Sequence, residues 1–256
     1  VQLVDGGRAC LVTRGALDNP ELGPETSSSR TLGMVWSPVP AFSASLDHFS
    51  ITRRNEVLSG SAFDSLDAFP RSLRRDAQGR LLSIDDYFAN VGRTRIDGWD
   101  LELRHLLASE AAGRFAFRLG AQSLIRLRHE PWPGATPRDE AGVNLPRRTA
   151  LGSVQWGMGA WSTQIALRYA SGMQVRGLDG ECPALNREAG RCRSPARYRA
   201  DLGLAWVGPD GWRVGLAVRD LLERAPREYD PVLAGYDVAW DDPVGRFFQF
   251  DLRRQF

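Results

Sequence analysis

The chain has 256 residues and a formal net charge of +2, and hydrophobic residues make up 43% of it. This length accommodates one large all-β domain or two smaller domains, with enough apolar residues for an ordinary core. The nearly balanced charge leaves no electrostatic footprint for a nucleic-acid partner. No stretch approaches the roughly 18 apolar residues of a membrane helix, so any membrane-spanning part must consist of strands.

Alternating apolar and polar residues predict about nine strands along the chain. The first two strands are expected at residues 30–37 and 42–53, joined by a short turn. A polar stretch follows at residues 56–90, which is too long for a hairpin turn and is expected to be a loop. The remaining strands are expected at residues 99–104, 114–128, 154–158, 161–169, 198–206, 212–218 and 248–256.

The last expected strand shows the pattern most clearly. Phe248, Phe250 and Leu252 share one face, whereas Gln249 and Asp251 share the other. Short turns alternate with long loops at residues 131–146 and 225–244 and around the cysteines. This asymmetry is typical of a bacterial outer-membrane barrel, in which the short turns face the periplasm and the long loops are extracellular.

Aromatic residues gather beside the short turns. Tryptophan suits a membrane boundary because its ring can be buried while its N–H stays hydrated, so a ring of such residues is expected to form a girdle. The expected girdle residues are Trp36, Phe42, Trp156, Trp161, Trp206, Trp212 and Phe256.

Three cysteines are present, and two of them lie close together in a Gly-, Pro- and Arg-rich segment. We expect Cys182 and Cys192 to form a loop disulfide, which requires an oxidising compartment such as the periplasm. A zinc site is a poorer interpretation because no histidine or second cysteine pair is near. No metal or other cofactor is expected, and Cys10 is left without a predicted partner.

No cluster of nucleophile, base and orienting acid is found, so no catalytic residue is assigned. Loop aromatics could instead grip a sugar or siderophore ring by stacking, although loop packing explains them equally well. These candidate ligand-binding residues are Tyr87, Trp132, Tyr229, Tyr236 and Trp240. Inward-facing arginines could attract an anionic ligand, but a hydrated barrel wall with paired charges is the favoured interpretation.

Several segments resemble TonB-dependent outer-membrane receptors. Residues 19–27 read NPELGPETS, which resembles the family's NPxLKPET segment with Gly23 in place of its lysine. Matches follow in family order at residues 45–49, at 90–98 before WDLEL, and at 245–248. Residues 219–224 match the penultimate strand more loosely, with Leu222 where the family has an aromatic.

The resemblance implies an antiparallel transmembrane β-barrel, of which this chain supplies about nine C-terminal strands out of roughly 22 around a plugged lumen. Residues 1–28 would form an extracellular loop or entry segment, and residues 29–256 the strands and loops. The plug domain is absent from this sequence, and we expect the chain to be part of a longer protein.

The resemblance also implies the partners and the function. The receptor would sit in outer-membrane lipid and take up a scarce small molecule, such as a ferric siderophore, cobalamin or a saccharide, when TonB pulls on the absent plug. Phe256 resembles the C-terminal aromatic that the barrel-assembly machinery reads. Two alternatives stay open: an outer-membrane barrel enzyme, and a soluble β-sandwich adhesin or sugar-binding domain, whose outward residues would be polar.

Overall fold

The computed structural model describes residues 2–5, 8–177, 180–226, 236 and 241–255. Nine long strands within this part form one continuous path in the order β16-β15-β14-β11-β10-β8-β7-β5-β4. Their bounds are β4 Thr26–Val39, β5 Phe42–Gly60, β7 Leu81–Ser109, β8 Gly113–Glu130, β10 Arg148–Met158, β11 Trp161–Ala170, β14 Arg197–Val207, β15 Trp212–Arg219 and β16 Phe247–Arg254. The predicted all-β antiparallel fold and the order of its strands are confirmed.

Short elements occupy the connections. They are β1 Gln2–Asp5, β2 Arg8–Leu11, β3 Thr13–Ala16, the 3-10 helix η1 Pro70–Ser72, β6 Leu73–Arg75, β9 Arg138–Asp139, β12 Met173–Gln174, α1 Ala184–Glu188, β13 Arg193–Ser194 and the 3-10 helix η2 Pro209–Gly211. No helix in the described part is long and apolar enough to cross a membrane.

The chain divides into two compact units. The first comprises residues 1–30, 50–97 and 126–140, and the second comprises residues 31–49, 98–125 and 141–256. Strands β4, β5, β7 and β8 each contribute residues to both units.

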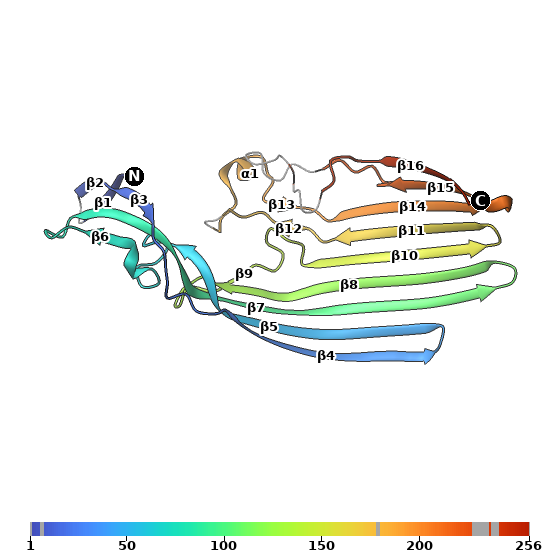
Figure 1. Ribbon diagram of the computed structural model, residues 1–256, viewed down its shortest axis with the longest axis horizontal. Helices are drawn as coiled ribbons and strands as arrows, with labels where there is room; N and C mark the ends of the chain where they lie inside the picture. The colour runs from blue at the N-terminus through green and yellow to red at the C-terminus, as the bar shows by residue number, and fades with distance from the viewer. Residues whose placement is uncertain (1, 6–7, 178–179, 227–235, 237–240, 256) are drawn as a thin grey trace. The chain divides into compact units, whose positions relative to one another are not determined.

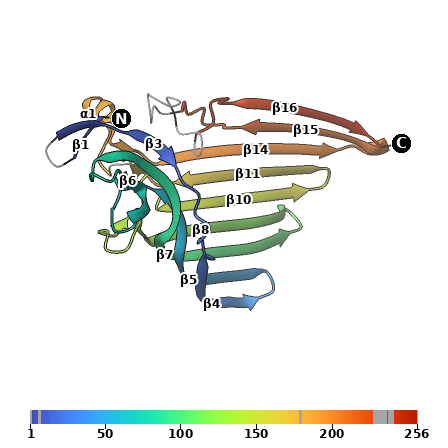
Figure 2. The same cartoon turned by 60° about the vertical axis from the view of Figure 1, so that its left-hand side comes forward.

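The second unit contains the regular hairpins, and Figures 1 and 2 both show β10, β11, β14, β15 and β16 as neighbouring strands. Residues that face one another across a ladder lie on the same side of the sheet. One row of paired residues runs Phe115, Trp156, Thr163, Leu204, Leu216 and Phe250. This row is largely apolar, and Phe250 is 68% exposed. The sheet therefore presents one apolar face to its surroundings.

The opposite face of the same strands is polar. Its paired residues include Arg118 with Ser153, Gln155 with Gln164, and Ala217 with Gln249. This two-faced sheet is the pattern that the sequence predicted, with lipid on the apolar side and a hydrated interior on the other.

The short turns depend on left-handed backbone positions. Gly113 and Gly211 have φ values of +82° and +75°. A Cβ atom at Gly113 would lie 2.5 Å from the carbonyl oxygen of Gly157, and one at Gly211 would lie 2.4 Å from that of Gln255. Glycine adopts such conformations freely, so these two positions let the hairpins reverse tightly.

The structure of the first unit shows that the expectation of a loop at residues 56–90 is wrong. Residues 56–90 are not a long loop, because β5 continues to Gly60 and β7 begins at Leu81. Residues 83–86 of β7 pair in parallel with β3, and residues 81–84 pair in antiparallel with β6. With 29 residues, β7 is much longer than the roughly 9–11 residues that cross a bilayer. The N-terminal part of β7 lacks a regular alternation of apolar and polar residues, so the alternation in the sequence did not predict this part as a strand.

A small aromatic core stabilises the first unit. Phe69 and Tyr87 are 2% and 5% exposed, and their rings meet edge to face with centroids 5.6 Å apart. Ala89 is buried with them, and Leu17 packs against the cluster. The core lies among residues that the sequence had assigned to a loop.

Candidate functional site

The family-like segment of residues 19–25 is held by the side chain of Asn90, which we call the Asn90 clasp, in the first unit. The side-chain Oδ1 of Asn90 accepts a hydrogen bond from the Gly23 N–H at 2.8 Å. Its Nδ2 donates to the carbonyl oxygens of Gly23 at 2.8 Å and Asn55 at 2.9 Å. One amide thus satisfies both backbone groups of Gly23, as a neighbouring strand would. The two family-like segments around residues 19–27 and 90–98 are in direct contact.

A chain of charged and polar groups continues from this clasp. Glu25 accepts hydrogen bonds from the Val57 N–H at 2.7 Å and from Arg53 at 3.1 Å. The Val57 amide, followed by Arg53, lowers the pKa of the Glu25 carboxyl. Arg53 also forms an ion pair with Glu56 at 3.1 Å.

The last contact in this network of side chains is made by a buried hydroxyl group. The Thr94 Oγ1 donates to Glu56 at 2.6 Å and lies 3.0 Å from Nδ1 of His129. The Glu56 side chain is 7% exposed, and its other oxygen is occupied by Arg53. A substrate has no access to this carboxylate, so the cluster positions strands and supplies no catalytic centre.

The second unit holds a separate network on its polar face. Arg197 binds Asp241 through two hydrogen bonds of 2.8 and 3.1 Å, and the two side chains are only 12% and 10% exposed. Arg199 contacts Asp242 at 2.9 Å and Asp201 at 3.3 Å. The Val244 amide, followed by Arg199, lowers the pKa of Asp242 despite opposing desolvation. These pairs attach the end of the last long loop to β14.

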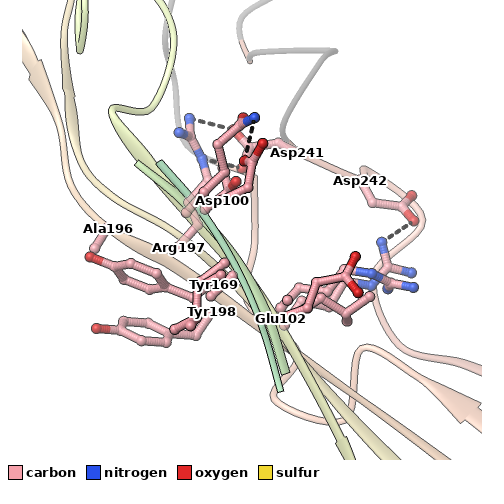
Figure 3. A pocket seen from close by; sticks show the side chains of 18 of the residues that line it. Asp100, Glu102, Tyr169, Ala196, Arg197, Tyr198, Asp241 and Asp242 are labelled. Atoms are coloured by element: carbon pink, nitrogen blue, oxygen red, sulfur yellow. Dashed lines mark hydrogen bonds and ion pairs between the residues drawn. The ribbon is translucent and has the colours of Figure 1, made fainter. Parts of the chain in front are cut away.

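The same network contributes to the lining of a hollow of about 1060 Å³. The lining of the hollow contains more carboxylates than guanidinium groups. Arg168 forms an ion pair with Asp201 at 2.5 Å. Asp100 accepts a hydrogen bond from Gln122 at 3.1 Å. Figure 3 shows the rings of Tyr169 and Tyr198 on the opposite side of the strands from Asp241 and Asp242. Arg168, Arg197 and Arg199 are therefore neutralised in place, as in a paired, hydrated barrel wall.

In the second unit, residues 142–144 bind the segment that begins at Met173, and together with residues 180–194 they form what we call the cap. The Sγ atoms of Cys182 and Cys192 are bonded in a disulfide. Asn144 exchanges two side-chain hydrogen bonds with the backbone of Arg176, at 2.7 and 3.0 Å. Gln174 of β12 pairs with Arg193 of β13, which joins the Asn144–Arg176 contact to the disulfide segment.

The candidate ligand-binding aromatics that the structure describes differ in how exposed they are. Tyr87 is buried, and its ring is covered by Phe69 and by the Arg71 guanidinium 5.6 Å from its centroid, so it offers no face for stacking. Trp132 and Tyr236 are half-buried. Tyr229 and Trp240 lie outside the described residues.

The six expected girdle residues that the structure describes lie beside the short turns, as their positions along β4, β5, β10, β11, β14 and β15 require. Trp36 meets Phe42 at 5.4 Å and Trp161 meets Trp206 at 6.3 Å between ring centroids. Trp156 donates its indole N–H to the Ala112 carbonyl at 2.8 Å. Trp212 carries the Arg254 guanidinium 5.2 Å from its centroid, and Phe256 lies outside the described residues.

The model of the TonB-dependent receptor-like β-barrel family matches residues 5–221. The chain belongs to this family. Its members are outer-membrane proteins, and the apolar outer face of the sheet agrees with that location for this receptor chain. A search of curated proteins gives no match.

Solved receptor structures share the fold. A mutant of the ferric enterobactin receptor PfeA from Pseudomonas aeruginosa is 16% identical with a TM-score of 0.62, over 91% of this chain and 31% of its own. The siderophore receptor PirA from Acinetobacter baumannii is 14% identical with a TM-score of 0.63, over 93% and 33%. The FrpB iron transporter from Neisseria meningitidis is 12% identical with a TM-score of 0.57, over 94% and 32%. The chain thus spans about a third of the length of these proteins.

The sequence indicated several of the residues described above, but it did not indicate which of them contact one another in this receptor chain. The segment around Gly23 was recognised as a motif, but its partner Asn90 could not be inferred from spacing. The Arg197–Asp241 pair joins residues 44 positions apart, across a connection whose path the sequence does not specify. A pair of opposite charges at two loop ends was the only available signal.

Proposed function

We propose that this chain forms part of the barrel wall and extracellular loops of a receptor that takes up a scarce small molecule across the outer membrane. The family match over residues 5–221 carries the proposal. The related structures include receptors whose names specify ferric enterobactin and siderophores, so a ferric siderophore is the first ligand class to test. Transport would require energy from TonB acting through a plug domain.

Within this proposal the chain contributes positioning and not chemistry. Residues 1–28 would serve as an extracellular entry segment, which the Asn90 clasp ties to β7. Trp132 and Tyr236 are the remaining described candidates for ligand contact, because Tyr87 is buried. Phe256 would be read by the barrel-assembly machinery, and the tryptophans beside the short turns would form the membrane girdle.

Uptake by the natural gene product tests the proposal. The gene would be deleted in its host, and accumulation of iron-55 would be measured with a panel of ferric siderophores as the iron source. Loss of uptake of one siderophore, restored by the intact gene and abolished when the proton-motive force is collapsed, is the expected result. Normal uptake of every siderophore, cobalamin and saccharide in the deletion strain would contradict it.

A further inference from the structure

The apolar face of the second unit ends in an unusual group of side chains on the side away from the short turns. Tyr169 of β11 and Tyr198 of β14 face each other across the ladder, with ring centroids 5.1 Å apart. They share their face with Ile165 and Leu202, which pair in the same register. Tyrosine at the end of an apolar band matches the level at which lipid tails give way to headgroups.

Two arginines flank this tyrosine pair. Ala150 faces Tyr169 across the β10–β11 ladder, so Arg148, two residues away on β10, lies on the same face. On the other side, the Arg224 guanidinium lies 5.7 Å from the Tyr198 ring centroid. Arg148 and Tyr198 are on strands separated only by β11, which corresponds to a spacing of about 10 Å. Arg148, Tyr169, Tyr198 and Arg224 form what we call the outer-rim patch.

The positive charge of the outer-rim patch is not neutralised within the described part of the chain. Both arginine side chains are exposed, and neither forms an ion pair with a described carboxylate. The carboxylate next in sequence, Glu223, is engaged by Arg246 at 3.0 Å. On the polar face, by contrast, Arg168, Arg197 and Arg199 are all paired with aspartates. The two unpaired guanidinium groups therefore lie on the lipid side.

We propose that the outer-rim patch binds the phosphate-bearing headgroup of a lipid in the outer leaflet. Guanidinium groups bind phosphate through charge-assisted hydrogen bonds, and basic residues at a membrane surface attract anionic headgroups. Tyr198 holds Arg224 by its cation–π contact, and the hydroxyl groups of both tyrosines can donate to the same phosphates or sugars. The acyl chains of such a lipid would cover the apolar band below, along Ile165 and Leu202.

The test uses the natural, full-length protein, purified in detergent and stripped of bound lipid. Native mass spectrometry would follow the retention of bis-phosphorylated lipid A. Replacing both arginines (Arg148→Gln with Arg224→Gln) should weaken retention roughly 10- to 30-fold, since each basic residue near a surface contributes about one kcal/mol. Retention should largely survive the charge-conserving pair Arg148→Lys with Arg224→Lys, which also checks that loss is not caused by misfolding.

A matched control is available at the other end of the barrel. Arg254 lies over Trp212 in a similar cation–π contact beside the short turns, and Arg254→Gln should leave lipid A retention unchanged. Equal retention by the double glutamine variant and the parent would overturn the proposal, as would equal retention of lipid A lacking phosphates. Binding of inorganic phosphate alone, lost in the double variant while lipid A binding persists, would assign the patch to free phosphate and also overturn it.

Discussion

The Asn90 clasp makes a specific prediction about the segment at residues 18–25. Replacing Asn90 with alanine removes three hydrogen bonds, two of them to Gly23. Each contributes roughly 0.5–1.5 kcal/mol net, and the segment is exposed, so the free energy of local opening should fall by about 1.5–3 kcal/mol. The segment's amide exchange should then accelerate roughly 10- to 150-fold, because about 1.4 kcal/mol corresponds to a factor of ten.

Hydrogen exchange with mass spectrometry on the natural protein in detergent provides the assay. Asn90→Asp keeps the acceptor for the Gly23 N–H and loses both donated bonds, so its exchange rate should fall between those of the parent and the alanine variant. Asn144→Ala breaks the Asn144–Arg176 contact and serves as the control, which should leave residues 18–25 unaffected. An unchanged exchange rate at Gly23 in Asn90→Ala would refute the claim that this side chain holds the segment.

Three further predictions concern packing, pH and the disulfide. Gly60→Ala should destabilise the first unit by about 1–3 kcal/mol in denaturant titrations, since its Cβ would lie 2.3 Å from the Phe69 ring; stability equal to the parent would contradict that contact. Because the folded-state pKa of Glu25 is lowered below 4.5, its contribution to stability is present above that pH and is lost as the pH falls through the folded value. Glu25→Gln should therefore flatten this acid dependence, and a variant that keeps the parent's full acid sensitivity would count against it. Replacing Cys182 and Cys192 by serine should lower the stability of the cap by roughly 2–3 kcal/mol, as expected for a closed loop of about ten residues, and protease sensitivity confined to the cap would measure this.

The strands of the membrane-facing region were predictable because each carries a physical signature. Phe248 and Phe250 alternate with Gln249 and Asp251, and a strand with one apolar and one polar face is the only regular element that fits this pattern. The turns were equally clear, since Gly113 and Gly211 mark reversals that require positive φ.

The first unit could not be predicted in the same way. Residues 81–86 of β7 pair with β3 and β6, and Tyr87 next to them is buried, so the apolar and polar residues of this stretch do not alternate between lipid and water. Long-range partners were also hidden. Gly60 and the ring of Phe69 are close in the folded protein, but the sequence around either residue does not indicate this contact.

Which face of the sheet meets lipid is tested most directly by two neighbouring residues of β11. Ile165 lies on the apolar face and Gln164 on the polar one. Unfolding of the natural protein from lipid vesicles would be followed for Ile165→Arg and Gln164→Arg. We predict that Ile165→Arg lowers the free energy of unfolding by about 2–4 kcal/mol, as for an arginine near the bilayer midplane, and that Gln164→Arg has little effect. Equal losses, or a larger loss for Gln164→Arg, would contradict the assignment of the apolar face to the membrane.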